Sequence, residues 1–221
     1  MSKLSNSILI TAAVVSLAAG VWFAKSNTQN TQTIKPSAIQ GAIYPNAKVL
    51  NNFNLINQLS VKYTKKDLIN HWSLVFVGYT HCPDVCPTTM ALMGQITQIM
   101  NEQGVQPPQI IFLTVDPERD TAEVLKPYIA YFNENFIGLT GSIKEVSALS
   151  KQLNAVFRKA AGSSGKITEQ DYLMDHSSAL MLINPEGNLQ SILTAPHTPG
   201  VVIESIINSQ AYYEKTHQAN N

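Results

Sequence analysis

The chain has 221 residues, of which 44% are apolar, so it can fold as one substantial domain with appendages. Its 15 basic residues are balanced by 15 acidic residues, which gives a formal net charge of zero. This balance argues against a nucleic-acid-binding protein and against an acidic solvating tail. Partners must therefore be recognised by a local site rather than by bulk charge.

The N-terminus carries an uncharged apolar segment at residues 8–24, ILITAAVVSLAAGVWFA. Its length is near the lower limit for a helix that spans a bilayer. We predict that residues 1–25 are a membrane anchor; a cleaved signal peptide is the alternative, and both export the rest of the chain. The anchor is preferred because no Ala-x-Ala site ends the apolar run. We expect a single-pass protein of the bacterial inner membrane with its soluble domain on the periplasmic side.

Residues 26–43 are rich in Asn, Gln, Thr and Ser and predict a flexible polar linker. We assign residues 44–212 to a folded domain and residues 213–221 to a C-terminal tail.

Sequence patterns predict alternating strands and helices in the first half of this domain. Alternating apolar residues around 53–59 predict an edge strand or hairpin, and the apolar runs 73–79 and 109–115 predict buried strands. Helical spacing predicts a helix over residues 88–103, in which methionines share one apolar face. We interpret these methionines as core residues rather than metal ligands.

The second half continues with shorter elements. We expect Asp120 to cap a helix over 121–132, with Glu123 at the capping-box position, and Ser142 to cap a helix that runs to about residue 157. The remaining predictions are a strand at 137–140, a mobile loop at 160–171, two strands at 178–183 and 189–193 around the turn 184–187, and a last helix from Pro199. This order indicates an α/β thioredoxin-like fold, with a central mixed sheet flanked by helices.

Cys82 and Cys86 are the only cysteines, and they follow the first central strand. Open α/β sheets bind ligands at the carboxyl ends of their strands. Two cysteines this close indicate a reactive or metal-binding pair. The alternative is a purely structural role, as a local disulfide or as a pair of buried thiols. Because Pro87 favours the first helical position, Cys86 should lie near a helix N-terminus, whose dipole should lower the pKa of its thiol.

The cysteines are separated by three residues, whereas general thiol-exchange enzymes usually have two. The wider loop allows both sulfurs to face one centre, and two soft sulfurs plus one imidazole suit Cu(I). Cu(II) could use the same set with an added oxygen ligand, and zinc would normally require a fourth ligand. His176 is the candidate imidazole because the expected topology places the following strand beside the cysteine loop, and Asp175 could tune the local charge. The other histidines are weaker candidates: His81 is expected to point away from Cys82, and His71, His197 and His217 are expected to be solvated.

Three sequence blocks resemble the Sco/SenC family of copper proteins: Gly78–Pro87 (GYTHCPDVCP), Val115–Thr121 (VDPERDT), and Tyr172 with Asp175–Ser177. The resemblance covers about residues 53–207. It implies a thioredoxin fold, a membrane anchor, and a copper site formed by Cys82, Cys86 and His176. It also implies the supply of copper to, or the reduction of, the binuclear copper centre of cytochrome c oxidase, with the copper-binding subunit of that oxidase as acceptor and another copper chaperone as donor.

Three functional hypotheses follow, in order of preference. The first is a copper metallochaperone rather than an enzyme, although the same thiolates could also serve a thiol–disulfide reductase activity. The second is a membrane-anchored thiol–disulfide oxidoreductase in which Cys82 and Cys86 are redox-active and His176 is incidental. The third, a peroxide-reducing enzyme, is disfavoured because neither Arg119 nor Arg158 lies in a peroxidase motif. We interpret the charged residues of 116–120 as loop charges and a helix cap, with no catalytic role.

Overall fold

The computed structural model describes residues 16, 19–20, 39–169 and 171–218. The chain divides into two compact units, residues 1–35 and 36–221, and the fold below is that of the second unit. Most of the predicted anchor and linker lies outside the described residues; Ser16, Ala19 and Gly20 are helical. Among the described helices, none combines the length and the apolar character needed to cross a bilayer.

The second unit is built on a mixed sheet of eight strands in the order β1-β10-β9-β4-β5-β6-β2-β3. The strands β4, β5 and β6 are parallel neighbours, and β4 also pairs with β9 in the antiparallel sense. The strand bounds are β1 (Gly41–Lys48), β2 (Asn54–Asn57), β3 (Lys62–Thr64), β4 (Ser73–Gly78), β5 (Gln109–Thr114), β6 (Ile137–Thr140), β9 (Leu180–Ile183) and β10 (Leu189–Leu193).

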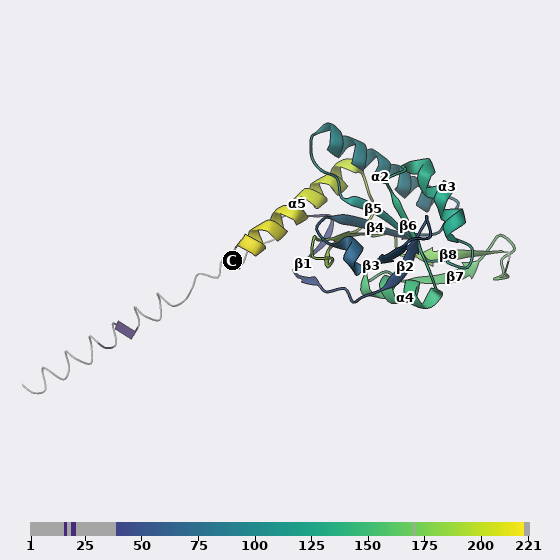
Figure 1. Cartoon of the computed structure of the whole chain (residues 1–221), viewed down its shortest axis with the longest axis horizontal. Helices are drawn as coiled ribbons and strands as arrows, with labels where there is room; N and C mark the ends of the chain where they lie inside the picture. The colour runs from purple at the N-terminus through teal and green to yellow at the C-terminus, as the bar shows by residue number, and fades with distance from the viewer. Residues whose placement is uncertain (1–15, 17–18, 21–38, 170, 219–221) are drawn as a thin grey trace, which may run out of the picture. The chain divides into compact units, whose positions relative to one another are not determined.

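Helices cover both faces of this sheet. Their bounds are α2 (Val85–Glu102), α3 (Ala122–Phe132), α4 (Ile143–Gln152) and α5 (Pro199–Gln218), with a short 3₁₀ helix at Lys65–Leu68. In Figure 1, α2, α3 and α5 lie above the sheet and α4 lies below it. The mixed α/β architecture predicted from the sequence is confirmed for the described residues.

The core explains why the central strands form where they do. All six residues of β4 are buried, so this strand has no polar face, as expected for a strand covered by helices on both sides. On α2, the buried face includes Met90, Met93 and Met100, all fully buried. The prediction that these methionines are core residues is confirmed.

A second, separate sheet of two strands lies beside the main one. The strands β7 (Phe157–Ala161) and β8 (Tyr172–His176) form an antiparallel hairpin. The hairpin projects from the domain at the right of Figure 1. Neither of these strands was predicted from the sequence.

One predicted helix end and one predicted helix cap are wrong. Helix α4 ends at Gln152 rather than near residue 157, because Asn154 adopts φ +57° and its backbone N–H closes the end of the helix on Lys151. The N-cap of α3 is Thr121, whose side chain accepts a hydrogen bond from the N–H of Val124. Asp120 does not cap this helix, because its carboxylate is fully buried and accepts its hydrogen bonds from Thr80 and Thr114 instead.

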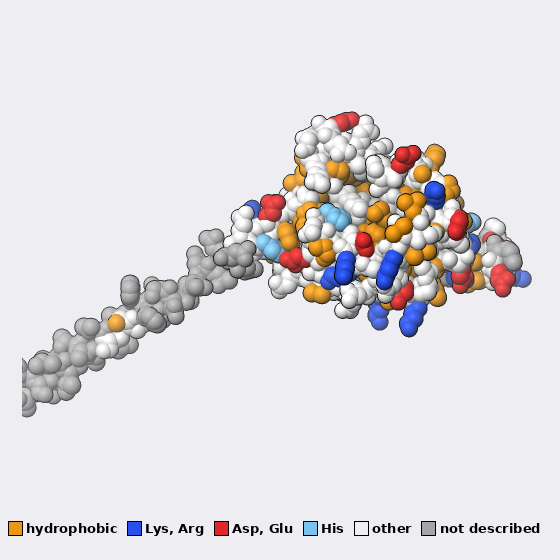
Figure 2. Space-filling view, in the orientation of Figure 1, with side chains coloured by type: hydrophobic (Ala, Val, Ile, Leu, Met, Phe, Trp, Pro, Cys, Tyr) orange, Lys and Arg blue, Asp and Glu red, His pale blue; other side chains and the backbone are white. Residues whose placement is uncertain are grey.

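The charges on the surface of the domain are mixed. Figure 2 shows basic and acidic side chains on the same face of the domain, with apolar side chains between them. This agrees with the formal net charge of zero.

Candidate metal centre

The first part of the site is the loop that leads from β4 into α2. Gly78 is the last residue of β4, and Cys82 lies in the loop, where its N–H donates to the carbonyl of Tyr79 (3.3 Å). Helix α2 begins at Val85, so Cys86 lies in its first turn, and its backbone N–H donates to Cys82 Sγ (3.4 Å). This contact places both sulfurs at the N-terminus of the helix, and both thiols are free.

His176 is the last residue of β8 and faces the cysteines from the hairpin. Its Nε2 lies 3.5 Å from Cys86 Sγ, and its Nδ1 lies 3.0 Å from the carbonyl of Ser177. A carbonyl only accepts, so Nδ1 carries a hydrogen, and Nε2 is the ring nitrogen that faces the sulfur and is available to a metal ion. Edge-on contacts with the rings of Phe76 and Tyr79, at centroid distances of 6.0 and 5.9 Å, fix the plane of the imidazole.

The three side chains therefore converge. The ligand atoms of Cys82, Cys86 and His176 all lie within 4.8 Å of one another. Bonds from these atoms to a zinc ion are about 2.0 to 2.3 Å long, so two of them can share one ion when they lie up to about 4.6 Å apart, and separations within 4.8 Å are close to that limit. Within the described part of the chain, no other group of three His, Cys, Asp or Glu side chains is close enough to share a metal ion.

The expected thiolate at Cys86 is wrong for the metal-free site. Burial raises the pKa of the Cys86 thiol well above its ordinary value, although a backbone hydrogen bond from Tyr79 opposes the shift. The loss of hydration exceeds the effect of the helix N-terminus because the Cys86 side chain is fully buried. A metal ion would have to displace this proton on binding.

The other histidines lie elsewhere. His81 is half-exposed and its Nδ1 contacts Thr80 Oγ1 at 3.0 Å, so it is directed away from the cysteines, as predicted. The histidines expected to be solvated all make hydrogen bonds: His71 with Gln109, His197 with the carbonyl of Ser178, and His217 with Glu186. Asp175 pairs with Arg158 rather than with the ring of His176.

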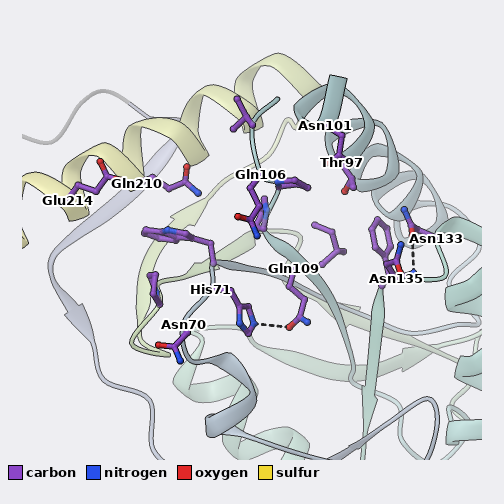
Figure 3. A pocket seen from close by; sticks show the side chains of 17 residues that line it. Asn70, His71, Thr97, Asn101, Gln106, Gln109, Asn133, Asn135, Gln210 and Glu214 are labelled. Carbon is purple, nitrogen blue, oxygen red and sulfur yellow. Dashed lines mark hydrogen bonds between the residues drawn. The ribbon is translucent and has the colours of Figure 1, made fainter. Parts of the chain in front are cut away.

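A hollow of about 690 Å³ lies near the amino ends of β4 and β5, at the end of these strands that is opposite the cysteine loop. Figure 3 shows that neutral amides line much of it, with a hydrogen bond between His71 and Gln109. It offers no cluster of metal ligands, in contrast to the cysteine–histidine site.

The family model that matches this chain is described as SCO1/SenC and covers residues 42–210. The chain belongs to the SCO1/SenC family. The matched residues include both cysteines and His176, and they span almost all of the second unit.

Relatives in this family are similar along much of the chain. An SCO2-like protein of Rickettsia felis is 30% identical over 91% of this chain and 97% of its own length. The mitochondrial SCO2 homologue of Danio rerio is 35% identical over 71% of this chain, which spans about half (55%) of the length of that relative. The crystal structure of Arabidopsis thaliana ScoI with copper bound shares 30% identity and a TM-score of 0.65, covering 73% of this chain and 97% of that one.

Sequence reasoning missed the residues that surround the ligands. Phe76 and Tyr79 flank the imidazole, and Tyr172 and Asp120 anchor the two segments that carry the ligands. The blocks that resemble the family contain all but Phe76, but sequence alone does not show which partners their side chains choose.

Proposed function

We propose that this protein is a copper metallochaperone that holds copper, as cargo, between Cys82, Cys86 and His176. The observation that carries this proposal is the convergence of two sulfurs and one Nε2 atom within 4.8 Å. This donor set suits Cu(I), since soft thiolates select it and three ligands satisfy its trigonal geometry. The copper bound by the related Arabidopsis protein supports the same choice of metal.

We propose that the acceptor is the copper-binding subunit of cytochrome c oxidase, as the family resemblance implies, and that another copper chaperone is the donor. A hollow of about 290 Å³ opens beside the site and is lined by His176 and its neighbours on the hairpin. An incoming ligand from the acceptor can approach His176 there. Release then begins at His176, because its hairpin lies outside the eight-stranded sheet that positions the cysteines.

We also propose that residues 1–25 anchor the protein in the inner membrane, with the copper site on the periplasmic side. This anchor proposal is tested by membrane fractionation and by protease digestion of intact spheroplasts. The anchor proposal requires that the chain remain with the membranes after carbonate extraction and that the folded domain be digested from outside.

The copper proposal is tested by titration of the reduced, purified chain with Cu(I) in competition with a chromophoric chelator. One bound ion is expected, and His176→Ala should weaken binding by at least about a hundredfold, since even outer partners of metal ligands contribute 10- to 100-fold. The matched control is His81→Ala, which removes an imidazole next to Cys82 that lies outside the ligand cluster. Equal affinities for the wild type and His176→Ala would contradict the proposed ligand set.

A reductase role is the second candidate, and the unequal exposure of the two thiols favours it. Cys82 is half-buried and Cys86 is buried, so Cys82 is the accessible nucleophile and Cys86 the resolving thiol. Attack by Cys82 on a target disulfide would give a mixed disulfide, and attack by Cys86 would release the reduced target and leave a Cys82–Cys86 disulfide. His176→Ala separates the two roles, because a pure reductase should keep its thiol chemistry while the chaperone loses tight copper binding.

A further inference from the structure

The segment Asp116–Asp120 follows β5 and lies between the two halves of the site. One end of this segment contacts the cysteine loop. The Asp120 carboxylate is fully buried and accepts hydrogen bonds from Thr80 N–H (2.9 Å), Thr80 Oγ1 (2.5 Å) and Thr114 Oγ1 (2.6 Å). Because a buried carboxylate is tolerated only when its oxygens are hydrogen-bonded, these contacts fix Thr80, two residues before Cys82.

The other end of the segment contacts the hairpin that carries His176. Tyr172 donates its hydroxyl hydrogen to Asp116 Oδ1 (2.7 Å), and Arg119, which is paired with Asp116, donates from Nη1 to the carbonyl of Tyr172 (3.1 Å). The guanidinium of Arg119 also lies 3.6 Å from the centre of the Tyr172 ring. The first residue of β8 is thereby held at three points.

The position of Tyr172 determines that of His176. Both residues belong to β8, and successive side chains of a strand alternate between its faces, so residues 172, 174 and 176 share one face. Tyr172 and Met174 are buried, and His176 is half-buried at the end of that face. Fixing the ring and the carbonyl of Tyr172 therefore fixes the register and height of the imidazole above Cys86.

We propose that the segment Asp116–Asp120 is a bracket that sets the separation between the cysteine loop and His176 before copper arrives. Asp120 positions the cysteines through Thr80, and Asp116 with Arg119 positions His176 through Tyr172. These are positioning residues, and none of them touches the metal. The inference rests on the proposed copper site, and it adds that the geometry of this site is preset by hydrogen bonds outside the ligand set.

The two ends of the bracket are separable by mutation. Tyr172→Phe removes the hydroxyl bound to Asp116 and keeps the ring, and Thr80→Val removes the hydroxyl bound to Asp120. The matched control is Tyr63→Phe, because Tyr63 is as buried as Tyr172 and donates its hydroxyl hydrogen to Gln109 (2.9 Å) away from the site. Each change is made in the wild type and in His176→Ala, and Cu(I) affinity is measured by chelator competition.

In the wild-type background, we expect Tyr172→Phe to weaken Cu(I) binding about tenfold, within the range for outer partners of metal ligands. In the His176→Ala background it should have no further effect, because Tyr172 acts only through the imidazole. Thr80→Val should weaken binding in both backgrounds because it acts on the cysteines. Tyr63→Phe should lower the melting temperature and leave copper affinity unchanged in both.

Tyr172→Phe with wild-type affinity, or with the same loss in both backgrounds, would overturn the bracket. A metal-free measurement keeps this result distinct from failure of the copper proposal. If the wild type binds no Cu(I), hydrogen exchange of the β8 amides still tests the bracket. The bracket requires that Tyr172→Phe accelerate exchange in β8 and that Tyr63→Phe leave it unchanged, and unchanged exchange in Tyr172→Phe refutes it.

Discussion

Gly78→Ala is expected to destabilise the domain and to displace one sulfur of the site. A Cβ atom at residue 78 would lie 2.8 Å from Phe112 Cε2, 2.9 Å from Cys86 Sγ and 3.1 Å from Phe76 Cε1. Since ordinary contacts begin at 3.4 Å, the sulfur would have to move by about 0.5 Å. All three neighbours are fully buried, so none can turn into solvent to make room.

Overpacking of this kind costs about 1 to 3 kcal/mol of unfolding free energy. For a domain of this size, each kcal/mol lowers the melting temperature by about 2 to 4 °C, which thermal denaturation followed by circular dichroism resolves. We also expect Cu(I) affinity to fall at least about tenfold, because binding sites lose function when their ligands shift by a fraction of an ångström.

The matched control is Gly94→Ala in the middle of α2, where the nearest heavy atom to the new Cβ lies at 3.8 Å. This change should stabilise the helix by about 0.5 to 1 kcal/mol and leave copper affinity unchanged. If Gly78→Ala melts at or above the wild-type temperature and binds copper as tightly, the close approach of β4 to Cys86 is not a constraint and the reasoning fails.

Two further predictions concern the thiol and the methionines. Burial raises the pKa of the Cys86 thiol in the folded protein, so the unfolded chain loses this proton at a lower pH. The free energy of unfolding of the metal-free protein should therefore be independent of this group below about pH 8.5 and should fall above it, by at most about 1.4 kcal/mol per pH unit. Urea denaturation between about pH 7.5 and 9.5 measures this slope. Cys86→Ala should remove this slope, and a slope that survives it would have another source. Met93→Leu should cost less than about 1.5 kcal/mol and Met93→Ala about 2 to 5 kcal/mol, with copper affinity unchanged in both; a loss of affinity in Met93→Leu would contradict its assignment to the core.

The sequence predicted the central part of the fold because its signals are local. The strands β4 and β5 are continuous apolar runs, and α2 has an apolar face at helical spacing, so each pattern reflects burial on the observed faces. The strand β8 was missed because Leu173 is partly exposed, and an apolar residue on the outer face hides the alternation that marks a half-buried strand.

The candidate site was predicted only in part. The pairing of Cys82 with Cys86 follows from their spacing, but the approach of His176 from 90 residues away depended on the expected topology and on the family resemblance. The prediction that Asp120 caps a helix and the prediction that the pKa of Cys86 is lowered were wrong for the same reason. Both depend on burial by segments distant in sequence, which a local cap or helix-terminus rule does not contain.

The separation of the three proposed ligands along the chain has a consequence for when copper would be bound. Cys82 and Cys86 are four positions apart, so an unfolded chain already presents both thiols as a chelating pair. The imidazole joins them only after the hairpin has docked, and an ion held by all three then closes a loop of 90 residues. Copper should therefore bind the folded chain more tightly than the unfolded chain, and by this difference in affinity it should stabilise the fold. A newly made chain would thus bind copper weakly, and the formation of its tertiary structure would raise the affinity by adding one ring nitrogen to the ligands.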